Sequence, residues 1–273
     1  MPWRRQARCA NTEGGGAVSG KLKVKLSVDG SIARVALDRP EKLNALDPEM
    51  LGQLEEAVTQ VEQSNEIRVI ILEATGEKAF CVGADILAWT ALSPLGMWSE
   101  WVRRGHRIFD RVERARQPVI CAIQGLAYGG GLELALACDV RLVADTASLA
   151  MPEVKLGTVP GWGGTDRLAK LIGSARAKQM IFSGEPIAAK VAEHWGLANE
   201  LVPAASLRDR AAALAAKIAD NAPVAVQTAK QLIAGSTSAT LESLAAAVNA
   251  FSDDAKEGLA AFREKRAPKF KGL

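Results

Sequence analysis

The chain has 273 residues, of which 48% are hydrophobic and 24% charged, so it is long enough to bury a large core. Lysine plus arginine outnumber aspartate plus glutamate by only 34 to 31. With the charges scattered along the sequence, we expect no nucleic-acid partner and no membrane-surface patch. No apolar run approaches the roughly 18 residues of a membrane span, so we expect no membrane partner either.

The first 20 residues predict a disordered N-terminal tail, since the stretch TEGGGAVSG at 12–20 cannot pack a core. No secretory signal follows the opening MPWRR, although the early arginines are faintly similar to an organelle transit peptide. The cysteines, Cys9, Cys81, Cys121 and Cys138, form no C-x-x-C pair. Reduced thiols of this kind favour a cytoplasmic location.

From about residue 21 the pattern becomes regular. Residues 21–38 alternate polar and apolar side chains around an Asp-Gly pair, which predicts a β-hairpin. Asp47 is a candidate N-cap and Pro48 the first residue of a helix. A β-rich strand at 67–74, a helical stretch to about residue 115 and a buried strand at 118–125 follow. This alternation indicates α/β layers.

Beyond the buried strand at 118–125 come a buried helix and one more strand, and after them the chain is almost wholly helical. We expect a helix from about Gly130, a strand at 140–145, and then helices at roughly 165–195, 206–220, 223–234 and 241–264. The composition changes near Val202 and Pro203. We therefore expect a mixed α/β core over 21–203 and a helical C-terminal region over 204–273, as a domain or subdomain.

The stretch AYGGGLELALACD at 127–139 is the most unusual in the chain. Its glycines lie at a strand-to-helix turn, where free N–H groups and the helix macrodipole can bind an anion or a polarised carbonyl oxygen. A tight turn without any ligand would also explain them. Glu133 lies in the apolar helix that follows, where burial would raise the pKa of its carboxyl group. It could instead simply cap free N–H groups.

A second acid, Glu153, stands close to the glycine-rich PGWGG. Two carboxylates near one oxyanion site could share a water, one accepting its proton and the other donating a proton to carbon. The sequence has no Rossmann or P-loop glycine pattern and no G-x-S-x-G elbow, and its two histidines lack metal-ligand spacing. Any chemistry must therefore come from carboxylates or backbone.

Five motifs in the correct order resemble the enoyl-CoA hydratase/isomerase family, the crotonases. They are LDRPEKLNAL at 37–46, KAFCVGADI at 78–86, GGGLELALACD at 129–139, PEVKLGTVPGWGGTDRL at 152–168 and FREKRAPKFKG at 262–272. The resemblance covers nearly the whole chain from about Lys21. It implies a crotonase-like α/β fold (the ClpP/crotonase class), which is a spiral of β-β-α units with a helical C-terminal region that builds trimers, commonly paired into hexamers.

The resemblance also implies a hydratase site. The backbone N–H groups of Ala84 and Gly130 would form the oxyanion hole for a thioester carbonyl. Glu133 would deprotonate the attacking water, and Glu153 would protonate the α-carbon. The substrate-binding residues would be Asp85, Gly161, Trp162 and Lys265, the last meeting a CoA phosphate. No cofactor is expected, since coenzyme A is part of the acyl-CoA substrate.

Departures from the family pattern leave the substrate open. Leu87 stands where many relatives have a lysine, and Trp162 replaces a small residue found in some of them. Trp89, Trp98 and Trp101 lie in a segment that borders the expected acyl site. An enoyl-CoA isomerase, lyase or thioesterase is the alternative function, although isomerases generally lack an acid at the position of Glu133. A non-catalytic assembly or RNA-binding role is a further alternative.

Overall fold

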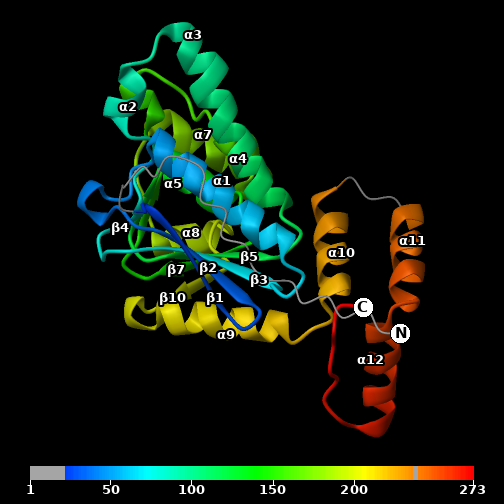
Figure 1. Ribbon diagram of the computed structural model, residues 1–273. Coiled ribbons are helices and arrows are strands. Elements are labelled where there is room, and N and C mark those ends of the chain that lie inside the picture. The colour runs from blue at the N-terminus through cyan, green and yellow to red at the C-terminus, as the bar shows by residue number, and fades with distance from the viewer. Residues whose placement is uncertain (1–21, 236–238) are drawn as a thin grey trace.

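The computed structural model describes residues 22–235 and 239–273, so the predicted tail at 1–20 lies outside the described residues. These residues form a mixed α/β body with two sheets, and three helices that extend away from it (Figure 1). The predicted hairpin is confirmed, with Val24–Asp29 paired antiparallel to Ile32–Leu37.

The larger sheet runs through the centre of the body. Its strands, in spatial order, are β1 (Val24–Asp29), β2 (Ile32–Leu37), β3 (Val69–Ala74), β5 (Val119–Ile123), β7 (Val140–Ala144) and β10 (Glu200–Val202). From β2 to β10 every neighbouring pair is parallel. Strands β3 and β5 are almost entirely buried, as expected for parallel strands covered on both faces.

The smaller sheet contains β4 (Ala79–Cys81), β6 (Leu126–Tyr128), β8 (Ser148–Ala150) and β9 (Ile187–Ala188). Its first three strands are parallel. The chain alternates between the sheets, with β3, β5 and β7 in the larger sheet and β4, β6 and β8 directly after them in the smaller one, and helices follow each pair. This repeat is the β-β-α spiral that the resemblance implied.

The spiral brings three loops together. Because β4, β6 and β8 are parallel neighbours, their carboxyl ends meet at the same edge of the smaller sheet. Ala84 follows β4, Gly130 follows β6 and Glu153 follows β8. The topology therefore gathers residues far apart in the sequence at one edge.

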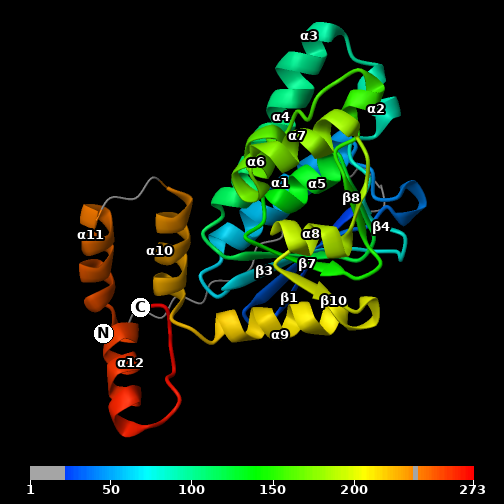
Figure 2. The same cartoon turned by 180° about the vertical axis from the view of Figure 1, so that it is seen from behind.

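Helices cover both sheets (Figures 1 and 2). They are α1 (Pro48–Gln63), α2 (Ile86–Thr90), α3 (Pro94–Gly96), a π-helical turn (Met97–Val102), α4 (Arg103–Arg114), α5 (Gly130–Leu136), α6 (Gly164–Ile172), α7 (Ser174–Ser183), α8 (Ala189–Trp195), α9 (Leu207–Ala219), α10 (Pro223–Ala234), α11 (Ala239–Ala250) and α12 (Asp253–Glu264). Short 3-10 turns occupy Pro40–Lys42, Glu153–Leu156 and Ala204–Ser206.

Two predicted features can be compared directly. The carboxylate of Asp47 accepts a hydrogen bond of 2.8 Å from the Met50 backbone N–H, so the predicted cap of α1 is confirmed. The helix expected over 165–195 is three helices instead. Gly173 and Gly184, with φ of 81° and 59°, end the first two, and β9 precedes the third. Glycine adopts this left-handed backbone readily, which is why the chain breaks there.

The last three helices differ from the rest. Helix α9 packs along the larger sheet, whereas α10, α11 and α12 form an arm beside the body (Figures 1 and 2). This arm exposes large apolar side chains: Ile233, Leu241, Leu244, Val248, Phe251, Leu259 and Phe262. Among the described residues, no helix has the length and apolar character needed to cross a membrane.

Candidate active site

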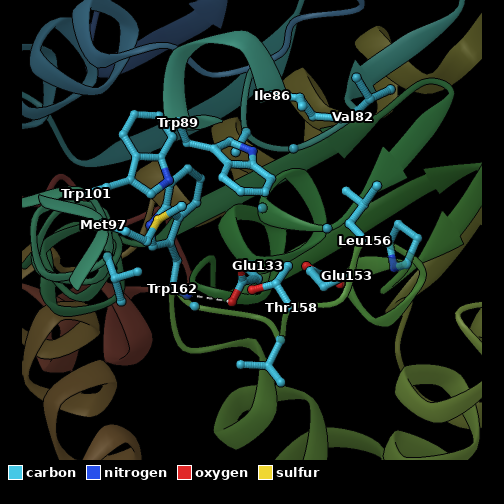
Figure 3. Close-up of a pocket in the computed structure, with 18 residues that line it drawn as sticks. Val82, Ile86, Trp89, Met97, Trp101, Glu133, Glu153, Leu156, Thr158 and Trp162 are labelled. Atoms are coloured by element: carbon cyan, nitrogen blue, oxygen red, sulfur yellow. Dashed lines mark hydrogen bonds between the residues drawn. The ribbon is translucent and has the colours of Figure 1, made fainter. Parts of the chain in front are cut away.

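The three loops at the edge of the smaller sheet line a cavity with a volume of about 130 Å³ (Figure 3). Six of the residues predicted for the site line it: Ala84, Gly130, Glu133, Glu153, Gly161 and Trp162. The rest of the lining is mainly apolar. A mostly apolar cavity with a few converging polar groups is the usual form of a small-molecule site.

The two residues predicted to supply backbone N–H donors, Ala84 and Gly130, both line this cavity. Gly130 is the first residue of α5, where an amide has no acceptor within its helix. Among the described residues the Ala84 amide has no hydrogen-bond acceptor, because the bridge to Leu46 uses the Asp85 N–H and the Gly83 carbonyl. A Cβ atom added at Gly130 would lie 3.5 Å from the Ala84 nitrogen, so the two amides are close neighbours.

The other two glycines of the triplet have structural reasons. Gly129 has a φ of 51°, and a Cβ there would lie 3.0 Å from Oε1 of Glu153. A Cβ at Gly131 would lie 2.1 Å from the carbonyl oxygen of Cys81, which leaves no room for any side chain. Close packing against Cys81 therefore accounts for Gly131, while Gly129 and Gly130 border the cavity.

Glu133 is 2% exposed and is held by a distant loop. Its Oε1 accepts hydrogen bonds from the backbone N–H groups of Trp162 at 2.7 Å and Gly164 at 2.8 Å. Glu133 thus caps α6, which begins at Gly164, and not its own helix. Burial raises the pKa of its carboxyl group, while these N–H groups and the charge of Arg167 oppose the rise.

Glu153 has the opposite surroundings. It begins a 3-10 turn after β8, and both of its carboxylate oxygens are buried without a hydrogen-bond partner among the described residues. Burial, with a contribution from the negative charge of Glu133, raises the pKa of Glu153 to about 7. The two acids line the same cavity, as the sequence predicted, and Figure 3 shows both near its centre.

Arg167 positions the loop that holds Glu133. The side chain is buried, and it donates to the carbonyl oxygen of Trp162 at 2.8 Å. On its other side it pairs with Asp110 and Glu113 of α4. This contact fixes the peptide unit that lies between the two units whose N–H groups Glu133 accepts. Sequence reasoning missed Arg167, although an arginine on the otherwise apolar face of α6 was a usable signal.

Aromatic side chains close one side of the cavity. Trp162 is 3% exposed and packs against Trp101 and Phe109, with ring centroids 5.4 Å and 5.2 Å away. Trp89 and Met97 also line this side, and Leu156 lies on the other side (Figure 3). The predicted tryptophan segment therefore borders the cavity in part, but Trp98 is 62% exposed and lies outside the lining.

Two predicted substrate-binding residues do not line the cavity. The Asp85 carboxylate caps α2 by accepting from the Leu87 N–H and pairs with Arg39 at 2.7 Å, which lowers its pKa. Lys265 is exposed beyond the end of α12 on the C-terminal arm. Leu87 is 78% exposed. Within the described part of the chain, no cluster of three or more His, Cys, Asp or Glu side chains could hold a metal ion.

Comparison with known proteins places this site in a family. A family model for enoyl-CoA hydratase/isomerase matches residues 27–273. A short-chain-enoyl-CoA hydratase of Clostridium acetobutylicum is 38% identical and covers 89% of this chain and 95% of that protein. An (E)-benzylidenesuccinyl-CoA hydratase of Thauera aromatica is also 38% identical, covering 92% of this chain and 100% of that protein.

Solved structures agree with the sequence comparison. The crystal structure of an enoyl-CoA hydratase from Bacillus anthracis has a TM-score of 0.89 and 37% identity, and covers 92% of this chain and 100% of that one. Pseudomonas aeruginosa DspI has a TM-score of 0.88 at 33% identity, covering 94% and 100%. The predicted crotonase-like fold is therefore confirmed, and the chain belongs to the enoyl-CoA hydratase/isomerase family.

Proposed function

We propose that this protein is an enoyl-CoA hydratase, a hydro-lyase that reversibly adds water to 2-enoyl-CoA thioesters to give 3-hydroxyacyl-CoA. The observation that carries the proposal is the meeting, in one apolar cavity, of two buried acids and two backbone N–H groups that have no acceptor among the described residues. The hydratases among its relatives support the same reaction.

The Ala84 and Gly130 N–H groups supply the electrostatic part of the mechanism. Attack of water on the β-carbon moves negative charge onto the thioester oxygen, which becomes an enolate oxygen. Two fixed donors aimed at that oxygen stabilise the transition state more than the ground state, and one such donor is typically worth roughly 3 to 4 kcal/mol. The macrodipole of the short helix α5 adds positive potential at Gly130.

The two acids divide the proton transfers. Oε1 of Glu133 is held by two N–H groups, so Oε2 takes the proton of a water whose oxygen bonds to the β-carbon. Protonated Glu153 gives its proton to the α-carbon and becomes a carboxylate. Afterwards Glu133 carries the extra proton and Glu153 lacks one, and exchange with solvent restores the starting state. Glu133 and Glu153 are thus a pair whose environments separate their roles.

Coenzyme A enters as part of the substrate, and the mechanism uses no resident cofactor. The cavity accommodates the acyl end, while the nucleotide lies outside it. Lys265 binds a CoA phosphate of a neighbouring subunit, since it lies on an arm that stands apart from the cavity of its own chain. The exposed apolar side chains of that arm support assembly as a homotrimer or a hexamer of paired trimers.

The cellular location stays a proposal. Cys81, Cys121 and Cys138 are buried free thiols, which favours the reducing cytoplasm. Fatty-acid β-oxidation is one pathway that uses this reaction. The residues of the cavity indicate the reaction and not the pathway.

The test is an assay of the purified protein with crotonyl-CoA, longer 2-enoyl-CoAs and a 3-enoyl-CoA. We expect loss of the conjugated enone absorbance and a product heavier by one water. Conversion of the 3-enoyl-CoA to a conjugated isomer, without hydration of crotonyl-CoA, would favour the isomerase alternative. A lack of turnover with every thioester would overturn the proposed function. Light scattering of the same sample should give three or six times the mass of the chain.

A further inference from the structure

The size of the acyl group is the open question about this cavity. Two relatives at the same 38% identity are named for a short-chain substrate and for a benzylidenesuccinyl substrate. Overall similarity therefore does not choose between small and bulky acyl groups. The choice depends on the side chains that line the cavity beyond the two acids.

One indole ring fits between two glycines on different elements. A Cβ atom added at Gly105, in the first turn of α4, would lie 2.3 Å from Nε1 of Trp162. A Cβ added at Gly130, at the start of α5, would lie 2.6 Å from Cζ3 of the same ring. Glycine inside a helix is less favourable than alanine. The space that Gly105 leaves for the indole explains why it is there.

The ring is a fixed wall and not a mobile gate. Trp101 and Phe109 pack against it, with interplanar angles of 50° and 74°. Its backbone is fixed on both sides, because the Trp162 N–H donates to Glu133 and the Trp162 carbonyl accepts from Arg167. The indole is therefore packed against Gly105 and Gly130 as well as against the two other aromatic rings.

The wall lies directly beside the reacting groups. Gly130 presents one of the proposed oxyanion donors, and Glu133 is the proposed base at the β-carbon. Met97, Trp101 and Trp162 lie on the same side of the cavity (Figure 3). An acyl group that extended past the β-carbon in that direction would therefore meet the Trp162 ring. The cavity volume of about 130 Å³ is also below the roughly 300 to 1,000 Å³ of common ligand sites.

We propose that Trp162, seated between Gly105 and Gly130, closes the acyl end of the cavity and selects short, unbranched 2-enoyl-CoA thioesters over long-chain and aryl ones. This inference rests on the proposed hydratase function. It assigns the choice of substrate to one side chain and to the glycine that admits it.

The main experiment measures kcat/KM for crotonyl-CoA, decenoyl-CoA and cinnamoyl-CoA in the wild type and in Trp162→Ala, with Trp162→Leu as a milder substitution. We expect the wild type to prefer crotonyl-CoA. Each variant should raise the ratio of decenoyl-CoA to crotonyl-CoA activity by about 10-fold or more, because one methylene in an apolar pocket is worth about 10-fold or more in discrimination. An unchanged ratio in a folded variant would mean that the acyl chain leaves past Leu156 and would overturn the inference.

A second experiment tests the glycine. Gly105→Ala should push the indole into the cavity and lower kcat/KM for crotonyl-CoA at least 10-fold. The double variant Gly105→Ala, Trp162→Ala should regain most of that loss, since the added methyl then has room. Gly52→Ala is the matched control, because its added Cβ in α1 meets only the flexible end of Arg104, at 3.0 Å. A Gly105→Ala protein with wild-type activity would contradict the inference.

A binding measurement separates this inference from the proposed function. Calorimetry with butyryl-CoA and decanoyl-CoA, which cannot react, should show a preference for butyryl-CoA in the wild type that shrinks in Trp162→Ala. Retained chain-length selection with no hydration of any 2-enoyl-CoA would reject the proposed hydratase function but support the role of Trp162 in selecting the acyl group. Hydration without chain-length selection would support the hydratase function and reject the role of Trp162.

Discussion

Glu133 and Glu153 line one cavity, yet their surroundings differ in the hydrogen bonds that they offer to a carboxylate. Glu133 is on a fully buried helix and receives two backbone N–H groups from the loop before α6. Glu153 is on a short 3-10 turn and has no hydrogen-bond partner among the described residues. Hydrogen bonds favour the ionised form of one acid, and their lack favours the protonated form of the other. Burial raises both pKa values, so it is the difference in hydrogen bonding that supports the proposal of Glu133 as the base and Glu153 as the acid.

The largest effect is expected from removing either acid. Glu133→Gln keeps an oxygen that can accept from the Trp162 and Gly164 amides. Glu153→Gln gives up no side-chain hydrogen-bond partner among the described residues. Both variants should therefore fold and bind a saturated acyl-CoA normally. Each should lower kcat for crotonyl-CoA by about 10² to 10⁴-fold. Normal turnover by one variant would remove that acid from the mechanism.

A smaller loss of activity is expected from a substitution that loosens only the loop that holds Glu133. Arg167→Lys cannot reproduce the planar guanidinium that joins the Trp162 carbonyl to Asp110 and Glu113. We expect kcat to fall by about 10 to 100-fold, since a small displacement of a catalytic group is costly. Lys170→Ala is the control, because Lys170 lies on the same helix in an exposed pair with Asp166. Equal effects of the two substitutions would reject a positioning role for Arg167.

The contribution of Glu153 can be separated from that of Glu133 by the pH dependence of kcat/KM. Its pKa of about 7 means that raising the pH above 7 removes the singly protonated pair that both reaction directions need. We expect kcat/KM to fall about tenfold per pH unit well above pH 7, in hydration and dehydration alike. Arg167→Lys should keep this limb of the profile. A flat wild-type profile from pH 6 to 9 would contradict the assignment of Glu153 as the acid.

The same pKa makes a prediction about stability. Because the folded-state pKa of Glu153 lies above the ordinary glutamate value of 4.5, the folded chain holds the proton more tightly than the unfolded chain does. Stability is thus lost as the pH rises from about 4.5 through 7. Glu153→Gln should remove this loss and raise Tm at pH 8 by roughly 2 to 4 °C relative to the wild type, with a smaller difference at pH 5. Calorimetry at the two pH values measures it.

The smallest effect is expected from Lys265, which lies outside the cavity that the two acids line. Lys265→Ala should raise KM for crotonyl-CoA a few-fold and leave kcat unchanged, because its proposed contact with a CoA phosphate is the same in the ground and transition states. The neighbouring Lys269→Ala provides a matched charge control. A change in kcat with unaltered KM would show that Lys265 acts elsewhere.

Much of the fold and the site could be predicted from residue patterns. The hairpin and the α1 cap follow from local chemistry, and the family motifs indicated both acids. The smaller sheet was harder, since β4, β6 and β8 have only three residues each and no full period-two pattern. The partners of Glu133 were out of reach because Trp162 and Gly164 lie 29 and 31 residues away. Gly105 carries no local signal beyond being a glycine inside a helix.

The most direct test of the paired acids is a double-mutant cycle for kcat with crotonyl-CoA. If Glu133 and Glu153 act as a unit in one hydration step, the variant carrying both Gln substitutions should be no slower than the slower single variant, since either change already disables the pair. A loss in the double variant equal to the product of the two single losses would mean that the acids act independently. That result would contradict the proposed mechanism, in which both acids are needed for the same step.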